Sequence, residues 1–356
     1  MTVTAFPAGR SLERNDIPLD VPLPSFAHLI SMSDDIGTFE HADHSAARRN
    51  HGFCTDDTAR VLVVVCREPM PSRDVVEIGR TAFRFVADAQ DVDGQVRNRR
   101  TAAGRWKGRR SVEDCWGRSV WAFGTAAARA PEAWMRDSAL SHFDRGIGPR
   151  SPHRRAMAFA AVGAAEVLAV SPSHAGAREI LADTVTTIGP LGTDDSWPWP
   201  EPRLAYANAV LPEALLSAGH FLARPDVVEH GCVLLRWLLD RELAGGHLSP
   251  TPVGGAGPSD HAPAFDQQPI EVAAMADACA RAAWVTGDDS WLDGVELAAQ
   301  WFAGDNDAEV AMWDSLTGGG YDGLQAVGPN LNQGAESTIA LISTLQQARV
   351  MAAATS

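Results

Sequence analysis

Apolar, alanine-rich stretches recur six times along the chain, and each follows a polar segment rich in turn-forming residues. No two copies are near-identical, so the repeat lies in the pattern of residue types. The stretches begin near Thr55, Val112, Pro152, Leu204, Pro269 and Asn332. Their small side chains are typical of helices that pack closely together, so we expect six inner helices.

Between these stretches lie amphipathic segments whose charged residues recur at helical spacing. They cover residues 74–90, 132–145, 174–188, 226–242 and 290–302, and a shorter opening segment, 24–32, supplies a sixth. Six inner and six outer helices in alternation predict an all-α (α/α)6 toroid of six helical hairpins; the alternative is an irregular helical bundle or α-solenoid. We expect one domain over residues 1–356, with residues 1–23 as an extended N-terminal segment.

Turn-rich segments with clusters of Gly, Pro, Asp and Asn precede the inner helices. They include residues 91–96, 194–202, 245–261 and 316–323. In a ring of parallel inner helices these loops gather at one mouth, together with the helix N-termini and the positive ends of their dipoles. We therefore expect the functional site at this mouth.

The composition argues against several kinds of partner. The chain has 356 residues, 45% hydrophobic and 21% charged, which is typical of a globular protein with a large core. The formal net charge of -15 repels a phosphate backbone, and the Arg-rich stretch 97–110 is too short to reverse that field, so no nucleic acid partner is expected. Because no window of about 18 apolar residues and no export signal is found, we expect a cytoplasmic protein without a membrane partner, either monomeric or homodimeric.

The spacing of cysteines and histidines does not predict a metal centre. The five cysteines are scattered without a C-x-x-C pair, and no two histidines near the mouth share an H-x-x-x-H spacing. His41 and His44, in the polar segment EHADH, are interpreted as solvated side chains. The Gly-rich GGGYDG lacks the strand and the lysine of a phosphate-binding loop. We expect no metal and no cofactor.

Acidic residues stand in the first turn of several inner helices. Cleavage of a glycosidic bond takes one carboxylic acid, which protonates the leaving oxygen, and one carboxylate, which acts as base or nucleophile. The alternative is that each carboxylate only caps its helix, because Asp and Glu are favoured at helix starts. The acidic residues at these positions are Asp56, Asp57, Glu113, Asp114, Glu271 and Glu336.

For three of these acids, the surrounding sequence favours a catalytic role over a capping role. Asp56 and Asp57 are adjacent, and since one carboxylate is enough for a cap, its neighbour can face a substrate. Glu271 follows an apolar Pro-Ile step and precedes an apolar helix, so we expect a desolvated carboxyl group with a raised pKa, suited to a proton donor. The hypothesis pairs Asp56 or Asp57 with Glu271 and predicts a bell-shaped pH profile of the rate, with its maximum on the acidic side of neutrality.

Polar and aromatic residues near the acids complete the candidate site. Arg118, like Arg60, lies one turn after an acidic pair and can hold a carboxylate through two hydrogen bonds. The chain has 11 Trp against 2 Tyr, and exposed rings in the mouth loops would stack on the apolar face of a sugar. The candidate substrate-binding residues are Glu113, Asp114, Trp116, Arg118, Trp199, Tyr206, Asn208, Gln268, Tyr321, Asn332 and Glu336.

Five segments resemble the six-hairpin glycosidase-like proteins, namely HGFCTDDTARVL, SVEDCWGRSVWAFG, EPRLAYANAVLPEALLSAG, QQPIEVAAMADA and GGGYDGLQAVGPNLNQGAEST. The likeness spans residues 25–348. The size and high alanine content are similar to those of mycobacterial hydrolases of methylmannose polysaccharide, which cut α-1,4-linked mannose chains in the cytoplasm. The resemblance implies an acid pair from the first and fifth inner helices, here Asp56 or Asp57 with Glu271, and implies that Glu113 and Asp114 bind sugar hydroxyls.

The residues leave several functions open. The preferred one is a glycoside hydrolase acting on α-linked mannose oligosaccharide or polysaccharide, in which the long loop 245–267 walls a cleft and allows cutting inside a chain. A sugar epimerase or isomerase would need paired histidines at the mouth, for which His153 and His261 are candidates. A non-catalytic carbohydrate-binding or scaffold protein is a third interpretation. So is a terpene-cyclising toroid, although DDSW and SDDIG imitate its D-x-D-D motif only weakly.

Overall fold

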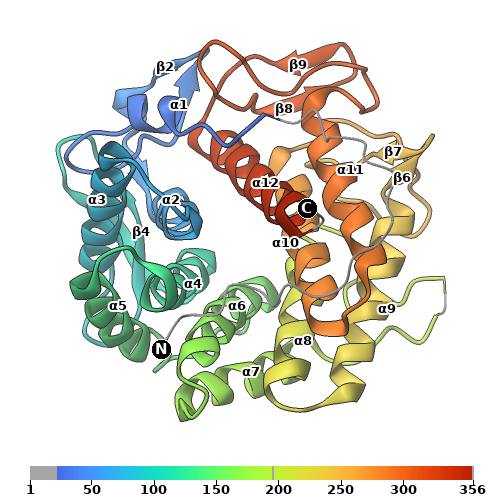
Figure 1. Cartoon of the computed structure of the whole chain (residues 1–356), viewed down its shortest axis with the longest axis horizontal. Coiled ribbons are helices and arrows are strands. Elements are labelled where there is room, and N and C mark those ends of the chain that lie inside the picture. The colour runs from blue at the N-terminus through green and yellow to red at the C-terminus, as the bar shows by residue number, and fades with distance from the viewer. Residues whose placement is uncertain (1–21, 195, 355–356) are drawn as a thin grey trace.

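Six inner helices form a closed ring (Figure 1). In the computed structural model, which describes residues 22–194 and 196–354, each inner helix contacts the next along the chain, and α12 contacts α2 to close the ring. The inner helices are α2 (Thr55–Arg67), α4 (Asp114–Arg129), α6 (Arg154–Val170), α8 (Val210–Phe221), α10 (Pro269–Thr286) and α12 (Ala335–Ala354).

Outer helices alternate with the inner ones and surround the ring (Figure 1). The short α1 packs against α12 and so completes the sixth hairpin. The predicted all-α (α/α)6 toroid is confirmed. The outer helices are α1 (Ala27–Ser31), α3 (Arg73–Ala89), α5 (Ala133–Gly146), α7 (Ala175–Ile188), α9 (Pro225–Arg241) and α11 (Leu292–Ala303), with single 3-10 turns at Arg49–His51 and Asp289–Trp291.

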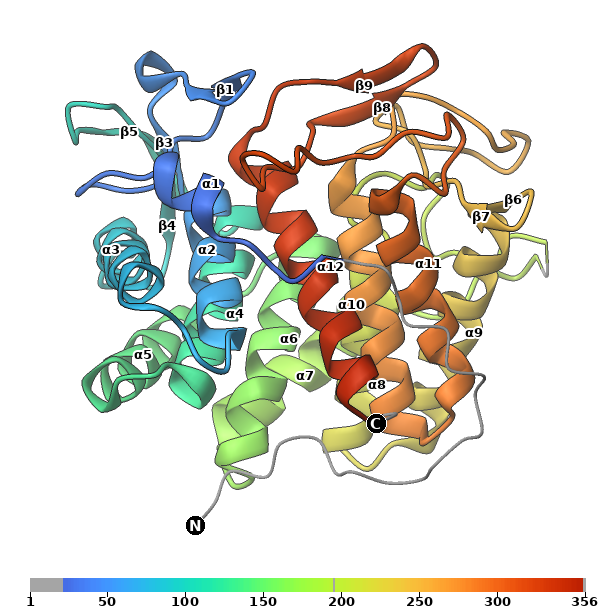
Figure 2. The ribbon, with the colours of Figure 1, turned by 45° about the horizontal axis from the view of Figure 1, so that its top comes forward.

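Short antiparallel strands extend the loops at one end of the ring, beyond the starts of the inner helices (Figure 2). Three two-stranded hairpins (β1-β2, β6-β7, β8-β9) accompany one three-stranded sheet, β3-β4-β5. Because β3 leads directly into α2, its pairing with β4 fixes the first turn of that helix. The strands are β1 (Ala42–Asp43), β2 (Ala46–Ala47), β3 (Phe53–Cys54), β4 (Val96–Arg100), β5 (Trp106–Ser111), β6 (Leu243–Ala244), β7 (His247–Leu248), β8 (Gly323–Gln325) and β9 (Gly328–Asn330).

Glycines bring α4 and α6 into backbone contact. A Cβ atom on Gly124 would lie 2.2 Å from the carbonyl oxygen of Gly163. No side chain fits at that distance, so only glycine permits this approach of the two helices. The small residues noted in the inner stretches therefore set how tightly the ring closes in this sector.

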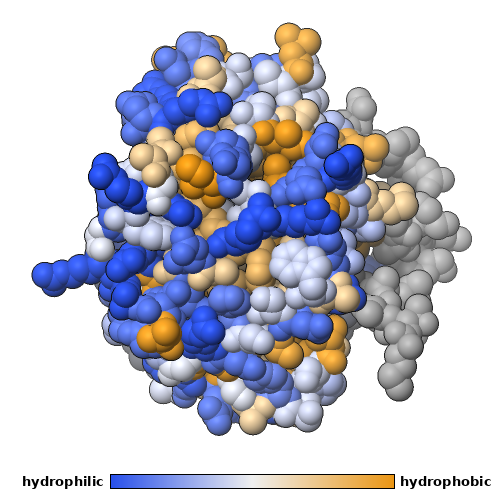
Figure 3. All heavy atoms as spheres, turned by 90° about the vertical axis from the view of Figure 1, so that its left-hand side faces the viewer, coloured by the Kyte–Doolittle hydropathy of each residue, from blue (hydrophilic) through white to orange (hydrophobic). Residues whose placement is uncertain are grey.

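The buried core lies where inner and outer helices meet. Residues 61–65 of α2 are all nearly inaccessible to solvent, as are the small residues along α6. By contrast, the face formed by α3 and α5 carries mostly hydrophilic residues with hydrophobic ones scattered between them (Figure 3). Among the described residues, no helix combines the length and the apolar character needed to cross a bilayer.

Most helix starts agree with the sequence-based expectation, and one does not. Helices α2 and α10 begin at Thr55 and Pro269, as predicted. Helix α8 was expected near Leu204 but begins only at Val210, because the chain makes an irregular turn in which Ala207 has a φ of 44°. Residues 1–21 of the predicted N-terminal segment lie outside the described residues.

Candidate active site

A cavity of about 410 Å³ opens between the starts of α2, α4, α10 and α12, and we call it the mouth cavity. Inner helices contribute carboxylate and guanidinium groups to its wall. The segment before α10 adds Gln268 and the β8-β9 hairpin adds Asn330. Its charged residues from the inner helices are Asp56, Asp57, Arg60, Arg118 and Glu336.

Arg60 joins two carboxylates from different helices. Its Nη2 donates to Oδ1 of Asp57 at 2.5 Å and to Oε2 of Glu336 at 2.9 Å. Burial raises the pKa of Asp57 to about 6, although the charge of Arg60 opposes this shift. Burial would also raise the pKa of Glu336, but the charges of Arg60 and Arg118 outweigh it, so that pKa lies below its ordinary value. The two carboxyl groups therefore have pKa values displaced in opposite directions.

Neither Asp56 nor Asp57 caps α2. The N-cap is Cys54, whose sulfur accepts from the backbone N–H of Asp57, while Oδ1 of Asn98 accepts from the N–H groups of the first two residues. The Asp56 carboxylate instead lies 3.2 Å from Nη1 of Arg118 and accepts from Nδ2 of Asn98 at 2.7 Å. Neither carboxylate is used to cap the helix, which weakens the capping interpretation of this pair.

A second cavity, of about 440 Å³, adjoins the first at Asp56, which lines both. Its wall contains Glu113 and Asp114 at the start of α4 and Tyr206 before α8. The Tyr206 hydroxyl donates to Oδ2 of Asp114 at 2.5 Å, and the residue is 41% exposed. Three candidate substrate-binding residues thus lie together, beside the mouth cavity.

Glu271 is buried and faces the start of α8. Its Oε1 accepts from the N–H of Ala207 at 2.5 Å, and its Oε2 accepts from the backbone and side-chain N–H groups of Asn208, each at 3.1 Å. Burial and the nearby charge of Glu242 raise the pKa of Glu271 to about 8, as its apolar neighbours suggested. However, Glu271 is not part of the wall of the mouth cavity that contains Asp56 and Asp57.

Three of the candidate substrate-binding residues are enclosed by protein, which corrects the expectation for them. Trp116 is 0% exposed and donates to the carbonyl of Gly146, so α4 turns it away from the mouth. Trp199 is 2% exposed and belongs to an aromatic stack. Asn208 is 0% exposed, and its Oδ1 accepts from Arg155. Their first contacts are internal, so none is available to a sugar.

Three further candidate substrate-binding residues differ in their burial and in whether they line the mouth cavity. Gln268 is half-buried and lines the mouth cavity. Tyr321 packs on the core, and burial raises the pKa of its hydroxyl. Asn332 accepts from the N–H of His44 at 2.9 Å and so tethers two mouth loops. Only the first of these three lies in the cavity wall.

Three acids of the mouth cavity were missing from the sequence-based set, namely Glu40, Asp266 and Asp322. Asp266 and Asp322 both line the cavity, and burial raises the pKa of each. Asp266 lies directly before the segment QQPIE, which the family resemblance includes, and Asp322 lies in the turn-rich segment GGGYDG. They could have been noticed there, but no helix start draws attention to them.

Only one group of metal-ligating side chains occurs in the part of the chain that the structure describes. It consists of Glu40, Cys54 and Asp57, whose ligand atoms lie within 4.8 Å of one another. Arg99 already pairs with Glu40, and Arg60 with Asp57. Because two guanidinium groups already neutralise the two carboxylates of this cluster, it is a poor site for a metal cation.

The histidines of the mouth lie in separate places. His41 lines the mouth cavity, and its ring lies 5.1 Å from that of His51. His153 lines the second cavity, whereas His261 lines a third one under the loop that follows α9. His153 and His261 therefore do not share a cavity.

No protein-family model matches the chain, and no curated protein matches it in sequence. Solved structures do match. The cellobiose 2-epimerase from Spirochaeta thermophila DSM 6192 has a TM-score of 0.66 at 12% identity, covering 91% of this chain and 93% of that one. A D-mannose isomerase gives 0.64 at 10% identity, covering 92% and 95%. A cellulase of C. cellulolyticium, in complex with cellobiose, gives 0.60 at 9% identity, covering 88% and 87%.

These structural neighbours share the (α/α)6 fold with the chain. They include sugar epimerases and isomerases as well as glycoside hydrolases, so carbohydrate chemistry of more than one kind is found on this ring. At identities of 9–12% the likeness is one of fold, and the reaction has to be argued from the site.

Proposed function

We propose that the protein is a glycoside hydrolase whose reaction takes place in the mouth cavity. The main support is that this cavity holds carboxyl groups whose pKa values are displaced in opposite directions. Burial raises the pKa of Asp322, whereas for Glu336 the charges of Arg60 and Arg118 outweigh burial and lower the pKa. In glycoside cleavage one carboxyl group donates a proton and another acts in its ionised form, and opposite displacements of two pKa values favour this division of roles.

In this proposal Asp322 gives its proton to the oxygen of the leaving sugar, and Glu336 acts as base or nucleophile. The Glu336 side chain is 41% exposed, so a substrate can reach it. Oδ1 of Asp322 accepts from the N–H of Gly334 and the hydroxyl of Ser337, each at 2.7 Å. No described residue bonds Oδ2, which is therefore the oxygen that carries the transferred proton.

Asp57 and Arg60 act as positioning residues. Asp57 is 3% exposed, and its two oxygens accept from Arg60 and from the thiol of Cys54. It cannot reach a substrate without breaking these bonds. Its charge and geometry instead hold Arg60, which in turn holds Glu336 in its ionised form.

The pair expected from the sequence, Asp56 or Asp57 with Glu271, stays a prediction that competes with this assignment. A protonated Glu271 would have to give up one of the N–H donors from Ala207 and Asn208 to turn its proton toward a substrate. Matched amide variants separate the two hypotheses. A large loss of rate in Asp322→Asn with a normal rate in Glu271→Gln supports Asp322 as the acid, and the opposite result supports Glu271.

For the substrate we propose an α-linked mannose chain, probed first with 1,4-linked oligosaccharides. The sugar and linkage rest on the resemblance in size and alanine content to the hydrolases of methylmannose polysaccharide. The mouth cavity and the second cavity meet at Asp56, so together they offer room for sugar units on both sides of a cleaved bond. This arrangement supports cutting inside a chain.

A sugar epimerase or isomerase is the second candidate, since His41 lines the mouth cavity. Such chemistry needs two proton-transfer groups on opposite sides of one carbon atom. The rings of His41 and His51 lie 5.1 Å apart, which leaves no room for a sugar between them. These two histidines therefore cannot stand on opposite sides of one sugar carbon.

The test is to incubate the protein with α- and β-linked oligosaccharides of mannose and glucose and to separate the products by chromatography. We expect shorter oligosaccharides with new reducing ends from an α-mannoside, and none from the Glu336→Gln variant. An epimerised or isomerised sugar of unchanged length would establish the second candidate. No product from any substrate would sink the proposal of an enzyme and favour a binding or scaffold protein.

A further inference from the structure

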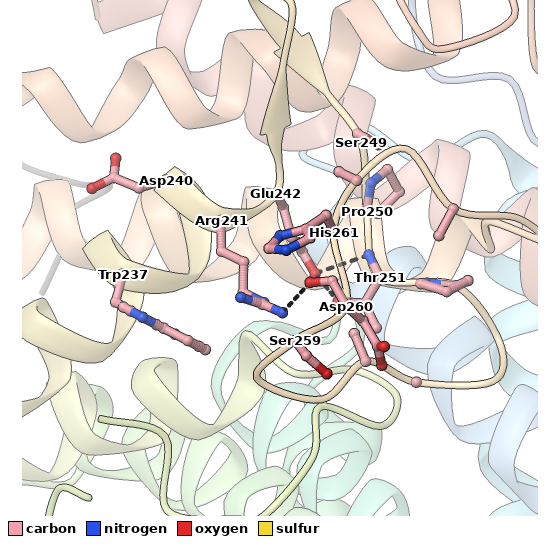
Figure 4. Close-up of a pocket in the computed structure, with 15 residues that line it drawn as sticks. Trp237, Asp240, Arg241, Glu242, Ser249, Pro250, Thr251, Ser259, Asp260 and His261 are labelled. Carbon is pink, nitrogen blue, oxygen red and sulfur yellow. Dashed lines mark hydrogen bonds between the residues drawn. The ribbon is translucent and has the colours of Figure 1, made fainter. Parts of the chain in front are cut away.

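A third cavity, of about 700 Å³, lies between the end of α9 and the loop of residues 249–264 (Figure 4). It shares no wall residue with the mouth cavity or with the second cavity. Its volume falls in the range of roughly 300–1,000 Å³ that is usual for small-molecule sites. The loop is held in place by Arg241, whose Nη2 donates to the carbonyls of Gly257 and Asp260 at 2.6 and 2.7 Å.

Glu242 lies in the wall of this cavity with one oxygen unused (Figure 4). The residue is 3% exposed. Its Oε1 accepts from the N–H and the hydroxyl of Thr251, at 3.0 and 2.5 Å, while no described residue bonds Oε2. Oε2 is not one of the fully buried side-chain atoms without a partner among the described residues, so it faces the cavity and can accept from a ligand or water there. Burial also raises the pKa of Glu242 to about 7.

The wall around Glu242 suits a neutral, hydroxyl-rich ligand. Trp237 contributes an indole that is held by stacking on Trp199, with ring centroids 5.9 Å apart. Asp240 and Ser259 add an acceptor and a hydroxyl group. The only arginine of the wall, Arg241, is already engaged by the loop carbonyls, so an anion would meet excess negative charge. Aromatic surface together with carboxylate and hydroxyl groups is the combination that binds a pyranose.

We propose that this cavity is a second carbohydrate site, which binds one pyranose unit through Glu242 and Trp237. The choice of a sugar as the ligand rests on the proposed function, because the cavity would hold a distant unit of the same chain that the mouth cleaves. Glu242 also lies close enough to Glu271 for its charge to raise the pKa of that carboxyl group.

The test follows the indole N–H signal of Trp237 by NMR while methyl α-D-mannopyranoside is added to the full-length protein, with the signal assigned through Trp237→Phe. In the variant Ser259→Trp a bulky ring fills the cavity. In the control Val253→Trp the same ring is added to an exposed position of the same loop, outside the cavity wall. We expect a saturable shift in the wild type and in Val253→Trp, and at least tenfold weaker binding in Ser259→Trp.

A second variant, Glu242→Leu, removes the unpartnered oxygen, and we expect it also to lose the shift. Should this variant fail to fold, Ser259→Trp decides alone. No saturable shift in the wild type, or equal affinity in Ser259→Trp, overturns the site. Hydrolysis of oligosaccharides is measured separately, so turnover without a Trp237 shift removes only the second site, whereas a shift without turnover removes only the hydrolase proposal.

Discussion

Two clusters of arginine and carboxylate side chains lie at opposite ends of the same ring. Helix α2 contributes to both, with Arg60 at the mouth and Arg67 two turns later on the same face. An apolar layer that includes Val63, Phe159 and Ile339 separates the two clusters. The mouth cluster consists of Asp56, Asp57, Arg60, Arg118 and Glu336. The base cluster consists of Arg67, Arg129, Glu166, Glu213, Asp277 and Arg281.

The two clusters differ in how completely the carboxylates are enclosed. In the base cluster Arg129 donates to both oxygens of Glu166, and Arg67 to both oxygens of Asp277. The exposed fractions of these two acids are 4% and 7%. In the mouth cluster the Glu336 side chain is 41% exposed beside a cavity of about 410 Å³. The same residue types therefore serve stability in one place and remain open to a ligand in the other.

The largest expected effect is on activity, at the mouth. Glu336→Gln keeps the size of the side chain but removes its charge, so we expect the rate to fall by about 10²–10⁴ with little change in melting temperature. The matched control is Glu68→Gln, because Glu68 is also a glutamate paired with an arginine, Arg349, but lies outside the mouth. Steady-state kinetics measure the rates of both variants, and thermal unfolding measures their melting temperatures. Equal rates in Glu336→Gln and Glu68→Gln would contradict a catalytic role for the mouth cluster.

The next effect is on stability, at the base. Asp277→Ala removes the one carboxylate among the described residues that is hydrogen-bonded to the buried Arg67, which costs about 3–5 kcal/mol of unfolding free energy. Denaturant unfolding measures this loss, and the folded fraction should keep its activity. The control is Asp226→Ala, which breaks the exposed pair with Arg224 and should change stability very little. If both variants were equally stable, the base cluster would not be a stabilising element.

A smaller effect concerns the pH dependence of stability. Burial and the charge of Asp277 raise the pKa of Glu213 to about 7, against about 4.3 in an unfolded chain. The folded state therefore binds the proton more tightly, and this stabilisation is present below the unfolded pKa and is lost as the pH rises through 7. Between pH 5 and 8 the wild type should lose about 2 kcal/mol relative to Glu213→Gln. Parallel curves for the two proteins would show that Glu213 is ionised throughout.

The ring was predictable because its signal is local. Alternating apolar and amphipathic stretches identify every hairpin, and turn residues mark most helix starts. Helix α8 was the exception, because the turn before it depends on the backbone of Ala207 and on its bond to Glu271, which is 64 positions away in the sequence. A contact between residues so far apart in the sequence leaves no periodic pattern of apolar and polar residues.

The site was predictable only in part, for the same reason. Asp56 and Glu336 lie at the starts of inner helices, and in a ring of parallel inner helices these starts lie at the same end. Asp322 reaches the mouth through the β8-β9 hairpin and the pairing of Gln267 with Leu324, which residue types alone do not reveal. The burial of Trp116 depends on which face of α4 meets Gly146. Aromatic content indicated a sugar ligand, but packing decides which rings can touch it.

The smallest expected effect lies at the edge of the mouth cluster, in Tyr206→Phe. Removing the hydroxyl breaks one bond to Asp114, in a residue that is 41% exposed, so water can replace part of what is lost. A neutral donor to a charged acceptor in such a place is worth about 1 kcal/mol, which predicts a rise in KM of about fivefold with kcat unchanged. A fall in kcat instead would mean that the second cavity takes part in the chemical step. The reacting groups would then include residues of the second cavity as well as those of the mouth cavity.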